Sequence, residues 1–340
     1  MQIKSDVYKN LIAINHKKQI VNIPNKIMRK LKWVEEQEQN LTPNSVCIVC
    51  NFSFKNKTRG WSDKIKAICH PFKNTDIFPN NKKLYLFSES DFCDDLWMPE
   101  IKPCSPKTEY KYEFFYFAIG TEQGVKCKGY YSLPIFCKIA GEMGSKAIIL
   151  DYYDVFPRPK FKSEGEYSKE WVLNRVVKEL KGRNNVDLIE GVQTQEKITE
   201  LMEQSRYVIF PNTMDASPRT IPETLIRGKP VLVNKGIYGG WKYVNEKNGL
   251  LFDAPSSCKE LDDNYDIYYK NIKDAMLYMR EHNFDYNSIR SEHLSKYGFI
   301  NSSKFLANII NEIEGKNLYT YVMYREFFKM VTEFQTKGKI

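Results

Sequence analysis

The chain has 340 residues, of which 42% are hydrophobic and 14% aromatic. This apolar content can bury a sizeable interior, so it excludes a disordered protein, and the length predicts two α/β domains. The net charge is +9, from 51 Lys and Arg against 42 Asp and Glu. Because the lysines are spread along the whole chain, this excess indicates a Lys-rich surface more than a nucleic-acid partner or an anionic membrane surface.

The sequence indicates a cytoplasmic protein. No apolar run approaches the ~18 residues of a membrane span, and the first residues lack an apolar signal-peptide core. We therefore expect no stable membrane insertion and expect the eight scattered cysteines to be reduced thiols. Cys47 and Cys50 form a C-x-x-C inside a predicted strand, but no second pair of ligands follows, so no metal site is predicted.

The N-terminal third, residues 1–108, is irregular and aromatic. Its predicted strands lie at 11–14, 46–52 and 83–87. Its predicted helices lie at 25–38 and 61–70. Residues 88–112 carry three prolines and no clear period, which is typical of a linker.

From residue 113 onward, strand and helix patterns alternate. Strands are predicted at 113–119, 146–150, 186–191, 207–210, 230–233 and 249–252. Helices are predicted at 130–143, 167–181, 195–205 with Thr194 as N-cap, 221–227, 259–283, 302–314 and 316–336. This alternation predicts a doubly wound parallel sheet.

The stretch 206–253 carries the most chemistry. Asp215 and Glu223 are eight positions apart, and Glu223 falls in the first turn of a predicted helix. A helix N-terminus that faces the carboxyl ends of parallel strands suits an anion such as a diphosphate. Carboxylates beside it can accept hydrogen bonds from sugar and ribose hydroxyls. The stretch therefore predicts a nucleotide-sugar site.

Neighbouring residues fit the same site. Ser217, Arg219 and Thr220 lie at the entrance of the predicted helix, where backbone N–H groups and a hydroxyl can bind phosphate oxygens. Gly239 and Gly240 allow close backbone approach. The alternatives are ordinary ones: Thr220 and Glu223 also match a capping box, Asp215 lies in a turn-prone run, and the two glycines suit a simple turn.

Eight short motifs follow one another along this half of the chain. They are Gly120, Lys128-Gly129, Gly191-Val192, residues 205–212, the pair Asp215 and Glu223, residues 228–231, Gly239-Gly240 and residues 248–251. In this order they resemble the nucleotide-sugar-binding half of a GT-B glycosyltransferase, most closely the retaining glycosyltransferase family four. The resemblance covers about 140 residues well, 113–253, and the N-terminal third poorly.

The resemblance implies a role for each charged residue. Glu223 would hold the ribose hydroxyls, and Asp215, which is Glu in the family, would contact hydroxyls of the transferred sugar. Lys128 would bind the diphosphate and stabilise its developing charge. The family usually has an arginine where this chain has Thr121, so Lys126 or Arg219 would supply the missing cation.

Other positions follow the family less closely. Gly120 and Gly191 would line the donor site. Tyr243 stands where the family often has an acid. His70 is the candidate for a family histidine of the N-terminal domain, with a packed or surface histidine as the alternative.

The resemblance implies a GT-B fold, with two Rossmann-like domains facing across a cleft. Residues 1–108 would form a reduced acceptor-side domain with a linker, residues 109–315 the donor domain, and residues 316–340 a helix returning to the first domain. The implied reaction moves a sugar from a UDP- or GDP-sugar to an acceptor hydroxyl, on a glycan, with retention of configuration and with neither metal nor cofactor.

Two other functions stay open at this stage. A nucleotide-sugar epimerase or synthase would use the same sheet. A basic nucleic-acid-associated protein, or a glycosyltransferase acting on DNA bases, has the net charge as its only support.

Overall fold

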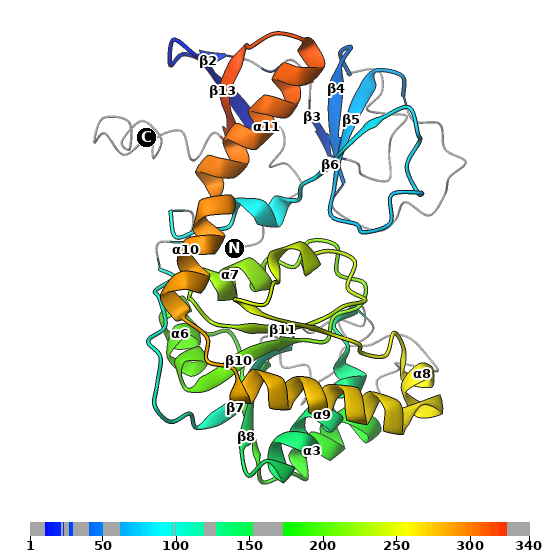
Figure 1. Ribbon diagram of the computed structural model, residues 1–340, viewed down its shortest axis with the longest axis vertical. Coiled ribbons are helices and arrows are strands. Elements are labelled where there is room, and N and C mark those ends of the chain that lie inside the picture. Colours follow the sequence, from blue (N-terminus) through cyan, green and yellow to red (C-terminus); the bar gives the residue numbers. More distant parts are fainter. Residues whose placement is uncertain are drawn as a thin grey trace. The chain divides into compact units, whose positions relative to one another are not determined.

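The computed structural model describes residues 11–21, 23, 27–29, 41–49, 62–96, 98, 100–118, 127–151 and 173–324. The chain divides into two compact units (Figure 1), one formed by Met1–Pro99 with Leu294–Ile340 and the other by Glu100–His293. Helix α11 (Phe299–Glu314) thus belongs to the first unit, whereas the sequence had placed it in the donor domain.

The second unit is built on a six-stranded parallel sheet. Its strands in chain order are β7 (Tyr112–Ala118), β8 (Lys146–Asp151), β9 (Val186–Glu190), β10 (Ser205–Phe210), β11 (Val231–Asn234) and β12 (Gly249–Phe252). Their spatial order is β12-β11-β10-β7-β8-β9. In this order the chain runs to one edge of the sheet, returns to its centre and then runs to the other edge. The predicted doubly wound sheet is confirmed.

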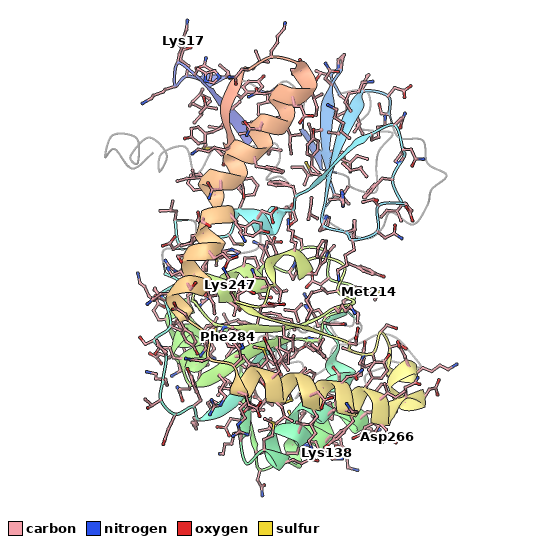
Figure 2. All side chains as sticks on the ribbon, in the orientation of Figure 1. Lys17, Lys138, Met214, Lys247, Asp266 and Phe284 are labelled. Carbon is pink, nitrogen blue, oxygen red and sulfur yellow. The ribbon has the colours of Figure 1, made fainter. Side chains whose placement is uncertain are left out.

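Helices cover both faces of this sheet. Helices α3 (Leu133–Glu142) and α9 (Tyr265–Glu281) lie on one face, and α6 (Gln195–Glu203) and α7 (Thr220–Leu225) lie on the other (Figure 1). The remaining helical segments are η3 (Tyr130–Ser132), η4 (Leu173–Val177), α5 (Lys178–Lys181), η5 (Trp241–Tyr243), α8 (Cys258–Asp263) and α10 (Tyr286–Lys296). In Figure 2, Lys138 and Asp266 mark the layer of α3 and α9, and Met214 marks the loop after β10.

Burial of apolar side chains explains this arrangement. Strand β7 is almost wholly apolar, so both of its faces must be covered, and Phe114 packs with Phe136 of α3 and Met276 of α9 in one core. Thr194 caps α6 as predicted, because its side chain accepts a hydrogen bond of 3.2 Å from the backbone N–H of Lys197.

The first unit contains two sheets. Its parallel sheet consists of β3 (Ile27–Arg29), β4 (Ser45–Ile48), β5 (Ile65–His70) and β6 (Lys83–Leu86). Its antiparallel sheet has the order β13-β1-β2, formed by Tyr319–Tyr324, Leu11–Asn15 and Ile20–Val21, and Lys17 in Figure 2 marks the turn between β1 and β2. A short 3-10 helix, η2 (Glu89–Phe92), follows β6. Leu306 and Ile310 of α11 share one core with Ile12 of β1 and Val46 of β4.

Three helices predicted from the sequence are wrong where the structure describes them. The segments 25–38, 61–70 and 316–336 contain strands β3, β5 and β13, and their described residues form no helix. Short apolar runs do not separate helix from strand by their period, so the partner decides. Strand β13 pairs along β1, with Met323 opposite Ile12, which gives its aromatic residues a sheet partner. Residues 30–38 and 325–336 of these predictions lie outside the described residues.

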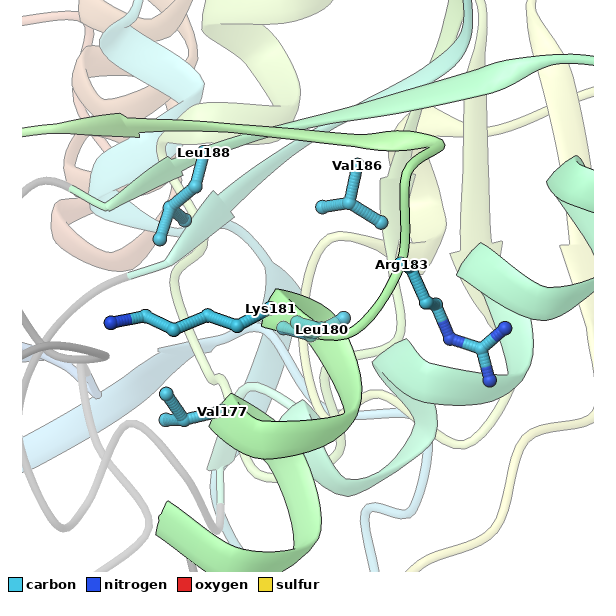
Figure 3. Close-up of a pocket in the computed structure, with 6 residues that line it drawn as sticks. All are labelled: Val177, Leu180, Lys181, Arg183, Val186 and Leu188. Carbon is cyan, nitrogen blue, oxygen red and sulfur yellow. The ribbon is translucent and has the colours of Figure 1, made fainter.

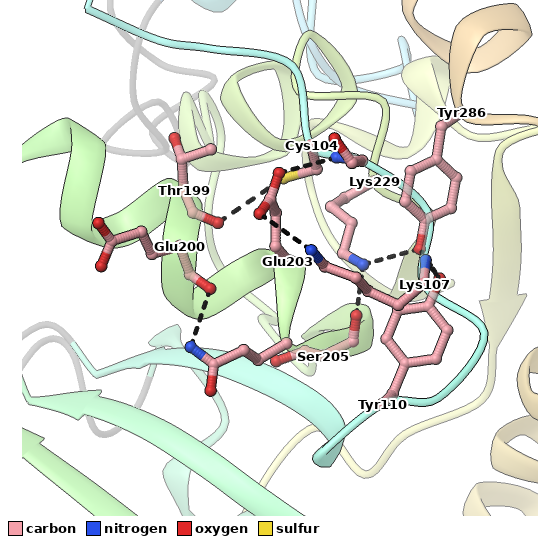
Figure 4. Close-up of polar contacts among 11 residues, drawn as sticks. Cys104, Lys107, Tyr110, Thr199, Glu200, Glu203, Ser205, Lys229 and Tyr286 are labelled. Atoms are coloured by element: carbon pink, nitrogen blue, oxygen red, sulfur yellow. Dashed lines mark hydrogen bonds and ion pairs between the residues drawn. The ribbon is translucent and has the colours of Figure 1, made fainter.

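A buried lysine joins three segments where the strands of the second unit begin (Figure 4). The Nζ of Lys229, just before β11, donates to the carbonyl oxygen of Ser205 and, at 2.7 Å, to the Tyr286 hydroxyl. The rings of Tyr110 and Tyr286 lie 4.8 and 4.7 Å from this nitrogen. Burial lowers the pKa of Lys229 to about 7, although the nearby Cys104 opposes that shift. The starts of β10, β11 and α10 and the segment before β7 therefore meet at one amine.

We predict that Lys229→Met removes a pH dependence of stability. The folded-state pKa of about 7 lies below the ordinary value of 10.5. Above pH 7 the folded protein has therefore released a proton that the unfolded chain still binds. The free energy of unfolding of the wild type, relative to the variant, should rise from pH 7 toward pH 10 by up to about 1.4 kcal/mol per pH unit. Urea unfolding across this range measures the difference.

The matched control is Lys247→Met, which removes an exposed lysine from the turn before β12. Its stability should follow that of the wild type at every pH. A difference between wild type and Lys229→Met that stays constant from pH 6 to pH 10 contradicts the prediction.

Candidate active site

The order of the strands defines where chemistry is expected in the second unit. Strands β7 and β10 are neighbours, with Tyr207 paired to Phe114. The chain leaves β7 toward α3 on one face of the sheet and leaves β10 toward α7 on the other (Figure 1). Such a divergence opens a ligand-binding crevice beyond the carboxyl ends of the strands in doubly wound folds. The residues that follow these two strands are therefore the candidates for a ligand site.

The loops after β7 and β10 are bonded to each other. The backbone N–H of Thr213 donates to the carbonyl oxygen of Cys127 at 2.9 Å. Gly129 has φ 69°, and a Cβ built there would lie 2.3 Å from the carbonyl oxygen of Pro211. Only glycine permits this approach. The turn at Lys128 and Gly129 is therefore held against the end of β10.

Two of the predicted catalytic residues meet at this point. Lys128 Nζ donates to Asp215 Oδ2 and forms an ion pair with it. The amide of Asn212 donates to the same oxygen at 3.0 Å. The Tyr116 hydroxyl of β7 donates a hydrogen bond of 2.9 Å to the carbonyl oxygen of Lys128, which fixes the backbone of the lysine. The sequence motifs placed Lys128 and Asp215 in one donor site, and the structure adds a direct contact between them that was not predicted.

A series of hydrogen bonds through Asn212 and Asn234 holds Asp215 in place. Asn212 is buried, and its carbonyl oxygen accepts from the side chain of Asn234 at 3.1 Å. The side-chain oxygen of Asn234 accepts in turn from the backbone N–H of Gly236 at 2.8 Å. Asn212 entered the sequence analysis only as part of the motif 205–212, and a polar residue two positions after a buried strand was the signal that it faces the site.

The Gly-Gly loop packs against the loop that carries Asp215. The backbone N–H of Gly239 donates to the carbonyl oxygen of Asp215 at 2.8 Å. Gly240 has φ 86°, and a Cβ there would lie 2.5 Å from Pro218 Cγ and 2.8 Å from Ile221 Cδ1. Gly240 therefore allows a close approach of the backbone to the start of α7, and Gly239 ties the same loop to Asp215.

Glu223 lies in the first turn of α7. The N-cap of α7 is Arg219 and no side chain caps the helix, so the alternative capping box of Thr220 and Glu223 does not form. The half-buried carboxylate makes no hydrogen bond or ion pair with any residue that the structure describes. Burial raises the pKa of the Glu223 carboxyl, and the charges of Arg227 and Arg219 oppose this rise.

Arg227 anchors the helix that carries Glu223. It is fully buried, and its guanidinium donates to the carbonyl oxygen of Glu223 at 2.7 Å, to the Thr199 hydroxyl at 3.1 Å and to the side-chain oxygen of Gln195. The last two residues belong to α6, so Arg227 locks α7 to its neighbour. An arginine inside the apolar run before Gly228 was the sequence signal for this role.

The other predicted donor residues divide into three groups. Ser217, Arg219 and Thr220 are partly exposed at the start of α7, next to the loop of Asp215. Gly191 ends the edge strand β9, two strands and ~10 Å from β7, so the structure does not bring it to the ion pair. Gly120 and Lys126 lie outside the described residues. Because α7 has only six residues, its dipole is small and side-chain cations matter more.

Elsewhere the structure offers little chemistry of this kind. Among the described residues, no group of three or more His, Cys, Asp or Glu lies close enough to hold a metal ion. The helices within the same residues include none that is long and apolar enough to cross a bilayer. His70 ends β5 in the first unit, where it is buried with its ring 5.0 Å from that of Phe78.

A cavity of about 250 Å³ lies beside the edge strand β9 (Figure 3). Its lining residues are Val177, Leu180, Lys181, Arg183, Val186 and Leu188. Four of these are aliphatic and none carries a carboxylate, so the cavity suits neither a sugar nor a ribose.

Solved structures show which fold this is. The chain aligns with the pneumococcal O-GlcNAc transferase GtfA in complex with UDP and GlcNAc at a TM-score of 0.51 and 11% identity, over 83% of this chain and 54% of that one. It aligns with the sucrose-phosphate synthase of Thermosynechococcus elongatus at a TM-score of 0.53 and 10% identity, over 85% of this chain and 74% of that one. It aligns with the lipopolysaccharide outer core galactosyltransferase WaaB at a TM-score of 0.50 and 10% identity, over 85% of this chain and 76% of that one. This chain has the GT-B glycosyltransferase fold.

The GT-B fold predicted from the sequence is therefore confirmed. No protein-family model matches the chain, and no curated protein matches its sequence. The chain spans about half the length of the first of these GT-B structures. At identities of 10–11% the likeness shows the fold alone, so membership of glycosyltransferase family four stays a prediction.

We predict that Gly129→Ala disrupts the position of Lys128. The new Cβ would meet the Pro211 carbonyl in a left-handed conformation, so we expect a loss of about 2 kcal/mol or more of stability. Gly144→Ala is the control, because Gly144 has φ 71° but nothing within 4 Å of a built Cβ, and we expect it to cost only about 1 kcal/mol. Urea unfolding of the two variants makes the comparison, and equal losses would show that the approach to Pro211 does not matter.

Proposed function

We propose that this chain is a glycosyltransferase that moves a sugar from a nucleotide sugar to an acceptor hydroxyl. The main support is the set of Lys128, Asp215 and Glu223, which follow β7 and β10 at their carboxyl ends; the Glu223 carboxylate has no hydrogen-bond or ion-pair partner among the described residues. A cation and two carboxylates at the switch point of a GT-B sheet match the three parts of such a donor: diphosphate, sugar and ribose.

The proposed roles follow from the charges. Lys128 binds the diphosphate, whose oxygens gain negative charge as the glycosidic bond breaks, and stabilises the transition state in this way. Arg219, at the start of α7, supplies a second cation, and the hydroxyls of Ser217 and Thr220 lie beside it. Glu223 accepts two hydrogen bonds from the vicinal hydroxyls of the ribose, as an ionised carboxylate can.

The identity of the donor and acceptor is a further part of the proposal. A UDP- or GDP-sugar is the expected donor, and the complex of GtfA with UDP and GlcNAc supports a uridine nucleotide. We propose a glycan acceptor, retention of configuration and a reaction that uses neither metal nor cofactor, as the resemblance to family four implies. The donor phosphate itself would then help to deprotonate the acceptor, so the site needs no strong protein base. We place the enzyme in the cytoplasm.

The other two functions have no observation in their favour. An epimerase would convert a nucleotide sugar without releasing a free nucleoside diphosphate, so measuring nucleotide release with and without acceptor separates it from a transferase. Binding to duplex DNA that persists at ~200 mM salt would support the nucleic-acid alternative, because non-specific electrostatic binding weakens steeply with salt.

The donor is best identified by a thermal-shift screen. UDP-, GDP-, ADP- and TDP-glucose, each tested against the wild-type chain, should include one that raises the melting temperature. A ligand at a hundred times its dissociation constant adds about 2.7 kcal/mol of stability, which such a measurement detects. Absence of a shift with every nucleotide sugar and with UDP, GDP, ADP and TDP themselves would contradict the proposed function.

Lys128→Ala should lower kcat by about 100-fold to 1,000-fold, because it removes the cation that stabilises the leaving diphosphate. The measurement is the initial rate of nucleoside diphosphate release in the presence of acceptor, with circular dichroism to verify the fold. Lys247→Ala, which removes an exposed lysine before β12, is the matched control and should keep the wild-type rate. A wild-type kcat in Lys128→Ala would exclude Lys128 from catalysis.

Glu223→Gln should act mainly on donor binding. The amide keeps one acceptor oxygen but loses the charge, so we expect the dissociation constant of the nucleotide to rise about tenfold to a hundredfold. Titration calorimetry with the nucleoside diphosphate tests this, and the exposed Glu246→Gln is the control. An unchanged affinity in Glu223→Gln would leave the ribose contact without support.

A further inference from the structure

The two carboxylate oxygens of Asp215 are bonded unequally in the ion pair at the candidate site. Lys128 Nζ and Asn212 Nδ2 both donate to one oxygen, Asp215 Oδ2. The other oxygen, Oδ1, has no hydrogen-bond partner among the residues that the structure describes. The two charged side chains are 19% and 13% exposed, so the pair is largely removed from water.

Asp215 is the fixed member of this pair. Its side chain is held by Asn212, and its own carbonyl oxygen accepts from the backbone N–H of Gly239 at 2.8 Å. Asn212 is held in turn by Asn234 at 3.1 Å. The ammonium of Lys128 instead ends a flexible four-carbon chain, and Asp215 is its one hydrogen-bond and ion-pair partner among the described residues. The lysine therefore takes its position from the acid.

This arrangement makes Asp215 a competitor of the diphosphate for Lys128. A diphosphate that binds Lys128 must share the ammonium with the carboxylate or take it over. The carboxylate then lies beside a second anion in a partly desolvated site, which is unfavourable unless something donates a hydrogen bond to it. A sugar hydroxyl does so, and a nucleoside diphosphate without a sugar does not.

We propose that Asp215 is a positioning residue that holds Lys128 in the empty site and makes the site prefer an intact nucleotide sugar to the spent nucleoside diphosphate. The proposal rests on the proposed function, because it requires that Lys128 bind a diphosphate. It differs from the role implied by the resemblance, in which this acid contacts only the sugar. Under the present proposal the acid also weakens the binding of the product, which favours its release after transfer.

The test compares two ligands on three proteins. Calorimetry measures the dissociation constants of the nucleoside diphosphate (whichever of UDP, GDP, ADP and TDP shifts the wild type) and of its glucose ester for wild type, Asp215→Asn and Asp253→Asn. Asp253 follows β12 at the same edge of the sheet and is exposed, so its variant controls for the loss of one charge.

We expect Asp215→Asn to bind the nucleoside diphosphate about tenfold more tightly than wild type, while the advantage of the nucleotide sugar over the diphosphate shrinks by a similar factor. Damage to the site does not produce tighter binding, so this result also excludes a merely structural role. Asp253→Asn should change neither constant by more than about twofold, because exposed charges are screened.

Two results would overturn the inference. If Asp215→Asn binds the nucleoside diphosphate as the wild type does or more weakly, Asp215 does not compete for Lys128, although the proposed function stands. If the wild type binds neither ligand, the proposed function fails and the inference fails with it. Asp215→Glu adds a further check, because a longer carboxylate that still pairs with Lys128 should keep the diphosphate affinity near the wild-type value.

Discussion

The pairing of β7 with β10 is the constraint on which the site depends. These strands are far apart in the sequence, yet Ser205 lies opposite Tyr112 and Val208 opposite Phe115. Because the second half of the sheet begins beside the first strand, the loop that carries Lys128 and the loop that carries Asp215 leave neighbouring strands. If β10 paired with an edge strand instead, the two side chains would start ~10 Å or more apart and no ion pair would form.

A lysine at each end of the sheet has a different electrostatic environment. Lys229, where the strands begin, is buried against a carbonyl oxygen and two phenol rings, and no carboxylate of the described residues bonds to it. Burial therefore makes its charged form unfavourable, and the pKa of Lys229 falls to about 7. Lys128, where the strands end, has a carboxylate partner and keeps some exposure to water. The first lysine joins elements of the fold, and the second remains available to an anionic ligand.

The sequence predicted the second unit better than the first for a physical reason. Strands such as β7 and β8 are long apolar runs buried on both faces, and helices with amphipathic patterns separate them, so the pattern alone identifies them. Strand β3 has only three residues, and β5 mixes apolar residues with Lys66 and ends on His70. Strand β13 is recognisable only through its pairing with β1, which depends on residues more than 300 positions away. Helix α10 was missed because its apolar residues follow no helical period.

The same distinction applies to the candidate site. Spacing and local chemistry identified Lys128, Asp215 and Glu223 as candidates. That the first two contact each other, that Asn212 shares their oxygen, and that Arg227 holds α7 to α6 depend on strand register and side-chain direction. Neither can be read from a single sequence, since both arise only when the sheet has assembled.

The proposed donor site raises a general problem of electrostatics, the cost of a buried cation that has no ligand. A site that binds a diphosphate must hold a cation in a partly dry environment, and an unpaired buried charge is costly while no ligand is present. Asp215, one methylene shorter than glutamate and held close to its own loop by Asn212 and Gly239, can pair with Lys128 without leaving that loop. Under the inference drawn above, it takes the place of the donor's anion until the donor binds. The shorter acid, which departs from the family at the sugar end of the site, would then keep the diphosphate end neutral in the absence of a ligand.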